Sequence, residues 1–392
     1  MKKIFIVSEY IHGAQNSTGY IWERVIEKLS SLELVGVISP KAQHGDVPLG
    51  VLDLRFVQRA FNKIDLRSRL WGQINLTLKF SWRICRSIRK GDVLLSGTNP
   101  AVLLAVIPLL KAIFRFKWVL LVHDVFPENL VPGGIVRKDQ IAYSALSLFF
   151  SRVYASADRL LVIGRDMKEV MSSKVGNAEK VVFVPNWASD REIFPIPRQE
   201  FFFADKDAWK GRIVFQFFGN IGRLQGIDNI LAAIEHVRNP KAVFLFVGDG
   251  AMAESVKRFV QVSSRSNVIY HEGIPSAEKN IGLAACDVAL ISLEKGMLGL
   301  GVPSKSYYSL AADRPLLAIV EKTSEVWRLI DEHGVGWHCE PGDPQALAEL
   351  IDRIADEDLA LKKGLPRQVL QQHFNEDKVL DLFFQQVRDV LH

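Results

Sequence analysis

Short apolar runs alternate with helical patterns along most of this chain, and this rhythm constrains the fold more than any other feature. In the first half, the runs are KKIFIVS from Lys2, LVGVIS from Leu34, DVLLSG from Asp92, KWVLLVHD from Lys117, RLLVI from Arg159 and KVVFVPN from Lys180. Helical spacing between them is clearest at about 20–29, 67–90 and 140–156, with Ser17 or Thr18 as the expected cap of the first helix. Apolar strands that alternate with helices are typical of a doubly wound parallel sheet, and we predict an α/β fold.

The rhythm lapses once, between Trp187 and Gly211, and then resumes. The later runs are RIVFQFFG from Arg212, AVFLFVGDG from Ala242, NVIYHEG from Asn267, VALISLEKG from Val288, PLLAIV from Pro315 and GVGWHCEPGD from Gly334. Helices are expected at about 228–237, 252–262, 277–285, 304–312, 344–355 and 375–391. We therefore expect a first domain at 1–193, a linker at 194–211, a second domain at 212–372 and a closing helical segment at 373–392. Two similar α/β halves suggest a ligand held in a cleft between them.

Cysteine usage and the apolar stretches limit the class of protein. Cys85, Cys286 and Cys339 are odd in number and lack metal-ligand spacing, which argues against a disulfide framework or a zinc site and favours the cytoplasm. MKKIFIVSEY predicts a first strand rather than a signal peptide. The apolar stretch from Ala101 to Val122 is interrupted by a proline and three cations, so no membrane-spanning helix is expected.

Positive charge is concentrated in one region. Between Val51 and Leu120 there are thirteen Lys or Arg against three Asp, whereas the formal net charge of the whole chain is only +5. This excess predicts an anionic partner. Nucleic acid is not expected, because the basic residues mix with apolar ones on helices outside any known reading motif.

Two glycine turns in the second half are typical of anion sites. The run VFQFFG reaches Gly219 and passes through Asn220, Ile221 and Gly222 to Arg223, before a helical pattern begins after Gly226. Backbone N–H groups at such a turn, the helix dipole and the Arg223 guanidinium all favour an anion. In EKGMLGLGVPSK, Pro303 is expected at the first position of a helix whose first turn holds Lys305. Two such turns on neighbouring strands suit a diphosphate, although each alone also fits an ordinary βα loop.

Polar residues follow the strands of the first half, at the edge where parallel sheets bind ligands. His123 ends an apolar run and is a candidate for bonding a sugar hydroxyl or orienting a reacting group, with a structural role as the alternative. Asp124 and Glu128 fit the same role or a turn cap. The sequence carries no metal-ligand cluster, no Gly-x-Ser-x-Gly elbow and no Gly-x-Gly-x-x-Gly fingerprint, so we expect no metal and no nicotinamide cofactor.

Taken together, these motifs resemble the family 4 retaining glycosyltransferases of the GT-B fold, in the bacterial branch that builds O-antigen, capsule and exopolysaccharide. The resemblance covers essentially the whole chain. Its anchors are STGY from Ser17, HDVFPENLVPGG from His123, VPN ending at Asn186, GNIGRLQG from Gly219, VGDG from Val247, VPSK ending at Lys305 and AADRP ending at Pro315.

The resemblance implies two Rossmann-like domains facing across a cleft, with a UDP- or GDP-sugar held by the second half and the saccharide acceptor by the first. His123, Arg223 and Lys305 are then the catalytic candidates, without metal or other cofactor, and the final helix packs back on the first domain. The implied donor-binding residues are Gly19, Gly219, Asn220, Gly222, Gln225, Gly248, Asp249, Gly250, Gly299, Leu300, Gly301, Val302, Pro303, Ser304 and Tyr308. The implied acceptor-side residues are Thr18, Asp124, Glu128 and Asn186.

Several positions depart from the family pattern. Leu300 and Tyr308 stand where members commonly carry two glutamates, the second of which holds the nucleotide ribose. Gln225 stands where a lysine often supports the diphosphate, and Asp313 replaces a helix-ending glycine. These departures leave two alternatives open, a nucleotide-sugar epimerase of the same fold and a non-catalytic nucleotide-sugar-binding or scaffold protein.

Enzymes of this branch act on polyprenyl-diphosphate-linked saccharides, which implies a peripheral location on the cytoplasmic face of the plasma membrane. The acid-free segment from Arg67 to Lys90, with Trp71 and Trp82, is typical of a helix that lies on anionic lipid. The segment Arg115 to Trp118 is expected to add to this surface. A solvated helix beside a buried one is the alternative interpretation.

Overall fold

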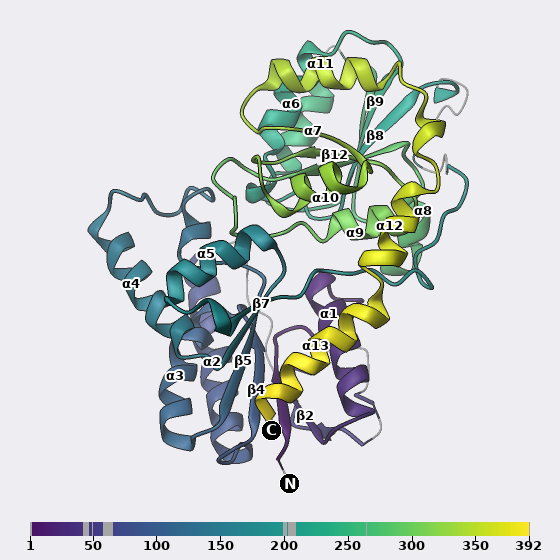
Figure 1. Cartoon of the computed structure of the whole chain (residues 1–392). Coiled ribbons are helices and arrows are strands. Elements are labelled where there is room, and N and C mark those ends of the chain that lie inside the picture. Colours follow the sequence, from purple (N-terminus) through teal and green to yellow (C-terminus); the bar gives the residue numbers. More distant parts are fainter. Residues whose placement is uncertain are drawn as a thin grey trace. The chain divides into compact units, whose positions relative to one another are not determined.

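The computed structural model describes residues 2–41, 47–48, 50–57, 66–198, 202, 209–263 and 265–391. The chain divides into two compact units. Unit 1 comprises Met1–Asn129, Val136–Val184 and Asp377–His392, and unit 2 comprises Leu130–Ile135 and Pro185–Glu376. Figure 1 labels their elements. The contact grouping changes at Pro185, earlier than the linker expected at 194–211, and the closing residues group with unit 1.

Unit 1 is built on a seven-stranded sheet in the order β3-β2-β1-β4-β5-β6-β7. All its strand pairs are parallel, with Ile4 of β1 opposite both Val35 of β2 and Val93 of β4. The strands are β1 (Ile4–Val7), β2 (Val35–Ile38), β3 (Leu52–Asp53), β4 (Val93–Gly97), β5 (Lys117–Val122), β6 (Arg159–Val162) and β7 (Val181–Phe183). The helices are α1 (Ser17–Ser30), α2 (Leu66–Ser87), α3 (Ala101–Phe114), α4 (Ile141–Ala155), α5 (Arg165–Val175) and α13 (Glu376–Leu391), with short 3-10 turns η1 (Glu128–Leu130) and η2 (Ala178–Lys180).

Unit 2 is built on a six-stranded parallel sheet in the order β10-β9-β8-β11-β12-β13. Its strands are β8 (Ile213–Phe218), β9 (Ala242–Val247), β10 (Val268–His271), β11 (Val288–Ser292), β12 (Leu316–Ile319) and β13 (Gly336–Cys339). Its helices are α6 (Ile227–His236), α7 (Ala253–Val262), α8 (Lys279–Leu283), α9 (Lys305–Ala311), α10 (Glu325–His333), α11 (Pro344–Ile354) and α12 (Leu365–His373). The 3-10 turns are η4 (Arg223–Gln225), η5 (Ser276–Glu278) and η6 (Leu359–Lys362).

The predicted fold class, two Rossmann-like doubly wound parallel-sheet domains, is confirmed. Central strands such as β4 and β9 are buried along their whole length, because helices cover both faces of a parallel sheet and leave no polar side. Strand order reverses between β1 and β4 in unit 1 and between β8 and β11 in unit 2. Ligands of open parallel sheets bind at such reversal points, beyond the carboxyl ends of the strands.

Helix starts differ from expectation in two places. Asn16, rather than Ser17 or Thr18, caps α1, because its side-chain oxygen accepts from Gly19 N at 2.8 Å. Pro303 lies before the N-cap Ser304 of α9 and not at the first helical position. Its carbonyl instead accepts from Ser306 N at 3.2 Å, which tightens the entry into the helix.

Helix α13 lies along unit 1 and ties the two ends of the chain together. The Lys2 amine donates to the Leu391 carbonyl, and Lys28 of α1 pairs with Asp381. Its buried side chains include Val379, Phe383 and Val387, which follow helical spacing. The last helix is therefore part of the core of unit 1 and not a free tail.

Cys85, Cys286 and Cys339 are free thiols. Among the described residues, no helix is long and apolar enough to cross a membrane. Within the same residues, no three His, Cys, Asp or Glu side chains gather as metal ligands.

Candidate functional site

In unit 2, the loops after β8 and β9 are held against each other by their backbones. Gly219 N donates to Val247 O and Ile221 N to Asp249 O, both at 2.8 Å. A Cβ on Gly248, where φ is +146°, would lie 1.9 Å from Gly219 O, and a Cβ on Gly250 would lie 2.4 Å from Ile221 O. The glycines at these two positions are therefore required by the contact between the loops.

Asp249 extends this arrangement to the loop after β10. Its carboxylate accepts from Gly273 N at 2.9 Å and from the Tyr270 hydroxyl at 3.4 Å. The Tyr270 hydroxyl also lies 3.0 Å from Gly248 O. Asp249 was predicted to bind the donor; here its carboxylate contacts β10 and the loop that follows it, while its backbone carbonyl accepts from Ile221 N of the β8 loop.

The turn from Gly219 to Gly226 is closed more tightly than the sequence predicted. The Gln225 side-chain oxygen accepts from Gly222 N at 3.0 Å, so Gln225 folds back on its own turn. The 3-10 turn η4 separates this glycine turn from α6, whose N-cap Gly226 has φ of +55°. The N–H groups of Gly219, Ile221 and Gly222 all have partners inside the protein, so these three amides are not free to bind an anion.

Two cationic side chains at this edge supply charge for an anion. The Lys305 amine donates to Asn220 O at 3.0 Å and lies 3.5 Å from the centre of the Phe217 ring. Desolvation by the surrounding protein lowers the pKa of Lys305 well below its usual range. The other is Arg223, which is exposed at the start of η4. The structure thus brings Lys305 onto the β8 loop, 3.6 Å from a Cβ built on Gly219.

The loop before Lys305 is only partly open. Gly299 has φ of +71°, and Leu300 N donates to Met297 O at 3.0 Å. Leu300 is 7% exposed, so it is buried. The loop from Gly301 to Ser304 is half-buried. A buried leucine cannot reproduce the contact of a carboxylate, so any contact of this position with an anion would have to come from its backbone.

Tyr308 is also buried, one helical turn after Lys305. The Lys279 amine lies 4.6 Å from the centre of its ring. Burial, with a smaller contribution from the Glu376 carboxylate, raises the pKa of Tyr308 above its usual value. The Tyr308 ring therefore packs with a cation where family members carry a carboxylate.

In unit 1, His123 and Asp124 follow β5 and face the end of β4. The Thr98 hydroxyl accepts from His123 N at 3.3 Å and from Asp124 N at 3.2 Å. His123 Nδ1 lies 3.6 Å from a Cβ built on Gly97, and the Trp22 ring lies 3.4 Å from the same point. The Nε2 of His123 is buried and has no hydrogen-bond partner among the described residues.

Burial shifts the pKa of these two neighbours in opposite directions. Desolvation lowers the pKa of His123 to about 4 and raises the pKa of Asp124 to about 6. At neutral pH the imidazole is therefore uncharged, and it can form a hydrogen bond with a hydroxyl group in this neutral form. A neutral imidazole and a destabilised carboxylate at one strand end suit a polar, uncharged ligand.

Other residues expected on the acceptor side have different surroundings. Glu128 accepts from Lys174 at 2.5 Å and from the Ser147 hydroxyl at 3.0 Å, so it pairs with side chains on α5 and α4. Asn186 is buried and belongs to unit 2, apart from His123 in the contact grouping. Thr18 is half-buried in the first turn of α1. Glu128 is thus better explained as a structural ion pair.

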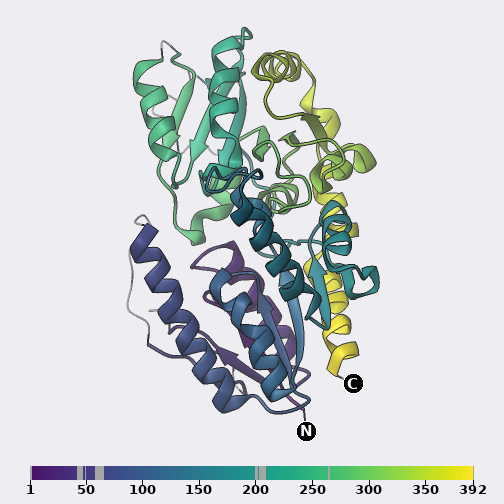
Figure 2. The same ribbon diagram turned by 90° about the vertical axis from the view of Figure 1, so that its left-hand side faces the viewer.

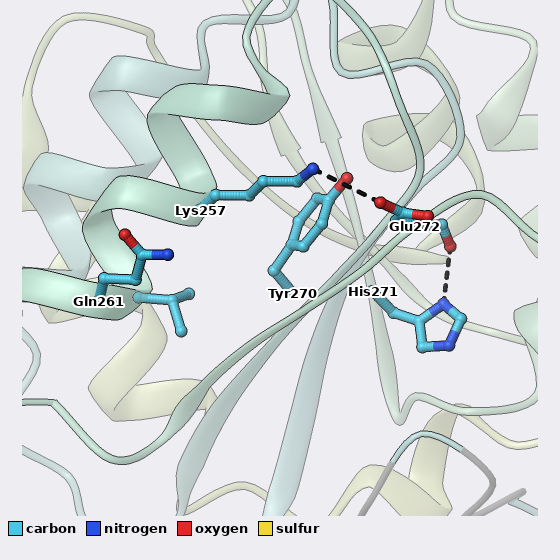
Figure 3. A pocket seen from close by; sticks show the side chains of 6 residues that line it. Lys257, Gln261, Tyr270, His271 and Glu272 are labelled. Atoms are coloured by element: carbon cyan, nitrogen blue, oxygen red, sulfur yellow. Dashed lines mark hydrogen bonds and ion pairs between the residues drawn. The ribbon is translucent and has the colours of Figure 1, made fainter.

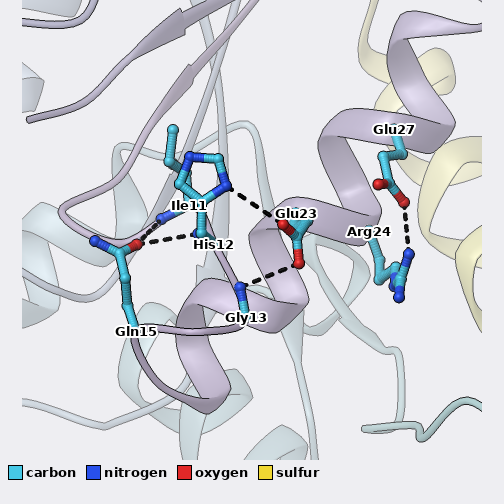
Figure 4. Close-up of polar contacts among 7 residues, drawn as sticks. All are labelled: Ile11, His12, Gly13, Gln15, Glu23, Arg24 and Glu27. Atoms are coloured by element: carbon cyan, nitrogen blue, oxygen red, sulfur yellow. Dashed lines mark hydrogen bonds and ion pairs between the residues drawn. The ribbon is translucent and has the colours of Figure 1, made fainter. Parts of the chain in front are cut away.

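The loop after β1 holds a histidine that the sequence analysis missed. His12 Nδ1 lies 3.3 Å from Glu23 Oε1, and the other oxygen of Glu23 accepts from Gly13 N at 3.1 Å (Figure 4). Gln15 Oε1 accepts from both Ile11 N and His12 N. A Cβ on Gly19 would lie 2.2 Å from His12 O, so this glycine is required by packing as well. Every polar atom of His12 except Nε2 is fixed, and Nε2 is buried without a described partner.

A separate pocket of about 480 Å³ lies between α7 and the edge strand β10 (Figure 3). Its lining includes Lys257, Tyr270 and Glu272, in which the lysine pairs with the carboxylate at 3.5 Å. His271 Nδ1 lies 2.7 Å from Glu272 O. The charged groups of this pocket satisfy one another, and none of the predicted site residues lines it.

Comparison with known proteins gives a consistent result. Residues 212–357 match the family model "Glycosyl transferases group 1". The chain is 52% identical over 398 residues to "Probable glycosyltransferase WbjE" of Pseudomonas aeruginosa, covering 100% of this chain and 99% of that one. It is 24% identical over 298 residues to WcaI of Escherichia coli K12, whose name assigns it to colanic acid biosynthesis, covering 71% and 70% of the two chains.

Solved structures show the same fold. Sucrose-phosphate synthase of Thermosynechococcus elongatus aligns with a TM-score of 0.76 at 15% identity, over 100% of this chain and 99% of that one. Anabaena HepE, solved in complex with UDP and glucose, aligns with a TM-score of 0.72 at 16% identity, over 99% and 100%. On the sequence match to WbjE and the family model, this chain belongs to the group 1 glycosyltransferases.

Proposed function

We propose that this glycosyltransferase moves a sugar, with retention and without a metal ion, from a UDP- or GDP-sugar to a lipid-linked saccharide during assembly of a cell-surface polysaccharide. The proposal includes membership of family 4 and a peripheral location at the cytoplasmic face of the plasma membrane, for O-antigen or capsule synthesis. The name of WcaI and the UDP-glucose complex of HepE support this choice of pathway class and donor.

The observation that carries the proposal is the Lys305 amine on the glycine edge of β8 and β9. The donor diphosphate would bind there, with Lys305 and Arg223 neutralising the charge that develops on it as the glycosidic bond breaks. A lysine with a lowered pKa gains most from such an anion, because the anion restores its charged form. Without an anion, the amine is satisfied only by Asn220 O and the Phe217 ring among its described contacts.

Unit 1 would bind the acceptor. His123 is neutral at working pH, and its free Nε2 would bond a hydroxyl of the saccharide or of the donor sugar. His12 offers a second nitrogen of the same kind at the end of β1. Both would position hydroxyl groups, whereas the charge needed by the leaving diphosphate comes from unit 2.

Turnover of a panel of UDP- and GDP-sugars with lipid extract from the membranes of the source cell tests the proposal. Transfer of labelled sugar to lipid, with chelator present and with the anomeric configuration of the donor kept in the product, is the expected result. Conversion of the donor to its epimer without lipid would favour an epimerase. Nucleotide-sugar binding without any turnover would favour a non-catalytic protein. Transfer that stops when divalent metal is removed would overturn the metal-independent part.

A further inference from the structure

Three helices of unit 1 form one layer over the same face of its sheet. Crossovers from β3 to β4, from β4 to β5 and from β5 to β6 all run in one direction across the sheet, and right-handed crossovers put their helices on one side. Helix α3 contacts both α2 and α4. Figure 1 places α2, α3 and α4 together, away from α1 and α13, and the second view in Figure 2 shows α2 and α3 side by side. The outer side of this layer is a single surface.

The outer side of α2 is apolar and aromatic. Trp71 is 71% exposed, Leu78 64% and Trp82 50%. Their spacing of seven and four residues puts them on one stripe of the helix. The Arg86 guanidinium lies 4.5 Å from the Trp82 ring and that of Arg83 lies 5.0 Å from it. This stripe therefore combines aromatic rings with cations.

The stripe continues on the neighbouring helices. Leu109 and Ile113 of α3, one turn apart, are each more than 60% exposed. On α4, Ile141, Leu148 and Phe149 share one stripe and are 89%, 56% and 43% exposed. Helix α4 buries only Val153 and Tyr154, although most of its residues are apolar. A helix that is apolar on all sides is normally covered on all sides.

Charge across this layer has one sign. From Leu66 to His123 the only acidic residue is Asp92, and none occurs from Gln140 to Ala157. Asp92 is buried and accepts from Lys3 N and Arg89 N at the opposite end of the sheet from the strand ends of the site. The surface defined by α2, α3 and α4 is thus apolar and basic.

We propose that this α2–α3–α4 surface is the membrane-docking face of the protein and that its occupant is an anionic lipid bilayer. The exposed side chains of α3 and α4 enter the interface between headgroups and acyl chains, and the arginines of α2 bind lipid phosphates. Two copies of a basic face repel each other, so charge complementarity favours lipid over a second copy of this chain. The inference rests on the proposed membrane location and adds α3 and α4, which the sequence did not indicate.

One part of the earlier expectation is wrong. Phe116 and Trp118 are 1% and 0% exposed, because they lie in β5 and its approach and point into the core. Lys111 and Lys117 lie 2.6 Å and 3.6 Å from carboxylate oxygens of Asp158. The segment Arg115 to Trp118 therefore offers neither the aromatic rings nor the free lysine needed to bind lipid.

Vesicle flotation with purified full-length protein tests the inference without any sugar donor. Vesicles of phosphatidylglycerol with phosphatidylcholine are compared at low and raised salt. Leu148→Ser with Phe149→Ser should lower binding roughly tenfold at both salt concentrations, because the lost contact is apolar. Arg83→Glu with Arg86→Glu should lower binding by tenfold or more at low salt, because roughly fivefold is expected for each charge removed. The loss should be smaller at raised salt, because screening weakens the attraction. Leu361→Ser, at an exposed leucine of unit 2, should bind like the unchanged protein.

Each outcome decides the inference. Absence of flotation on anionic vesicles at low salt overturns it, and so does unchanged binding of the α4 variant. A dimer in solution that the α4 variant dissociates would show that a second copy is the occupant instead. Thermal unfolding at the unchanged temperature verifies that the variants are folded. Because flotation needs no catalysis, loss of sugar transfer with retained flotation would count against the proposed function and leave this inference standing.

Discussion

The two strand-end sites of this enzyme are built by different means. In unit 2, the backbones of the β8 and β9 loops contact each other at glycines, and few side chains project from the edge except Lys305 and Arg223. In unit 1, the buried side chains of Thr98 and His12 and the half-buried side chain of His123 occupy the same end of the sheet. An edge formed by backbone contacts and carrying cations suits the diphosphate, which is the constant part of a donor. Imidazole rings held in fixed positions suit the hydroxyl groups of a saccharide, whose pattern varies. If this contrast is right, changes in the two units should affect different kinetic constants.

The largest expected effect is on the cation side of the contrast. Arg223→Ala should lower kcat of transfer by about 10²–10³-fold, because one positioned charge at a developing anion contributes on that scale. The melting temperature should stay unchanged, since Arg223 is exposed. Arg258→Ala, at another exposed arginine of unit 2, serves as the matched control. A fully active Arg223→Ala enzyme would contradict the assignment of the diphosphate to this edge.

Backbone contact in unit 2 can be tested through stability. Gly248→Ala should lower the free energy of unfolding by about 3 kcal/mol, since its Cβ would meet Gly219 O at 1.9 Å. Gly364→Ala shares a positive φ of +83° but meets no atom within 4 Å, so about 1 kcal/mol is expected. Denaturant unfolding of both variants measures the difference. Equal losses would mean that the contact between the loops contributes little.

In unit 1, replacing Asp124 is expected to raise the free energy of unfolding rather than lower it, and the size of this effect should depend on pH. Because the folded pKa of Asp124 is raised to about 6 from 3.8, folding holds its proton, and stability is lost as pH rises through this window. Asp124→Asn should therefore stabilise the protein at pH 7 by on the order of 1–3 kcal/mol, and leave it unchanged at pH 4. Thermal melts at both pH values check this. A variant that is destabilised at pH 7 would show that the carboxylate has an unrecognised stabilising partner.

His123 next to it has the reverse dependence. Its folded pKa is lowered to about 4 from 6.5, so the unfolded chain takes up a proton first and stability falls as pH decreases between these values. Asp124 therefore lowers stability as pH rises and His123 lowers it as pH falls. Both costs are present together between about pH 4 and 6, where the two groups are charged in the unfolded chain and neutral in the folded protein. This is expected of a site selected for binding rather than for stability.

Sequence patterns predicted the sheets well and the side-chain contacts poorly. Most strands were visible because they are continuous apolar runs, and the glycine turns after β8 and β9 because an apolar run ends there in glycines. Strand β3 was not predicted, because its two exposed residues, Leu52 and Asp53, form no apolar run. Helix α3 was not predicted, because its apolar run contains Pro108 and few polar residues separate it from β5. The outward stripe of α4 was also hidden, because composition alone predicts burial for such a helix.

The places of the candidate site residues in the fold were predictable where position along a strand or helix decides them. Lys305 and His123 follow from strand and helix ends, but the return of Gln225 onto Gly222 depends on a side-chain rotamer. His12 was missed because its partner Glu23 lies on the far side of a loop, in the second turn of α1. One signal was present: a histidine shortly after the first strand, followed by an acidic residue on the first helix.

Lys305 is expected to link donor binding to proton uptake. In the free enzyme its pKa is well below the usual value, and a bound diphosphate would raise it again, so UDP binding should take up as much as one proton in the pH range between the two values. Calorimetric titration of UDP in HEPES and in Tris, whose ionisation enthalpies differ, measures this uptake. Lys305→Met should bind more weakly and without the uptake, and Lys305→Arg should bind without it while keeping the charge. Identical uptake in the methionine variant would place the titrating group elsewhere.

The smallest expected effect tests whether unit 1 positions the acceptor through oriented imidazoles. Glu23→Gln should lower kcat/KM for the saccharide acceptor roughly tenfold, because the loss of one charged hydrogen bond leaves the His12 ring less well oriented. UDP affinity should not change, since the proposed diphosphate site is in unit 2. Glu27→Gln is the matched control, because this glutamate lies on the same helix but pairs at the surface with Arg24 at 2.8 Å (Figure 4). His12→Asn should reproduce the loss, since asparagine can still reach Glu23 but has no group at the position of Nε2, whereas His12→Gln should recover part of it. If the Glu23 variant instead bound UDP more weakly while its acceptor kinetics stayed unchanged, the proposed division, in which unit 2 binds the diphosphate and unit 1 positions the acceptor, would be contradicted.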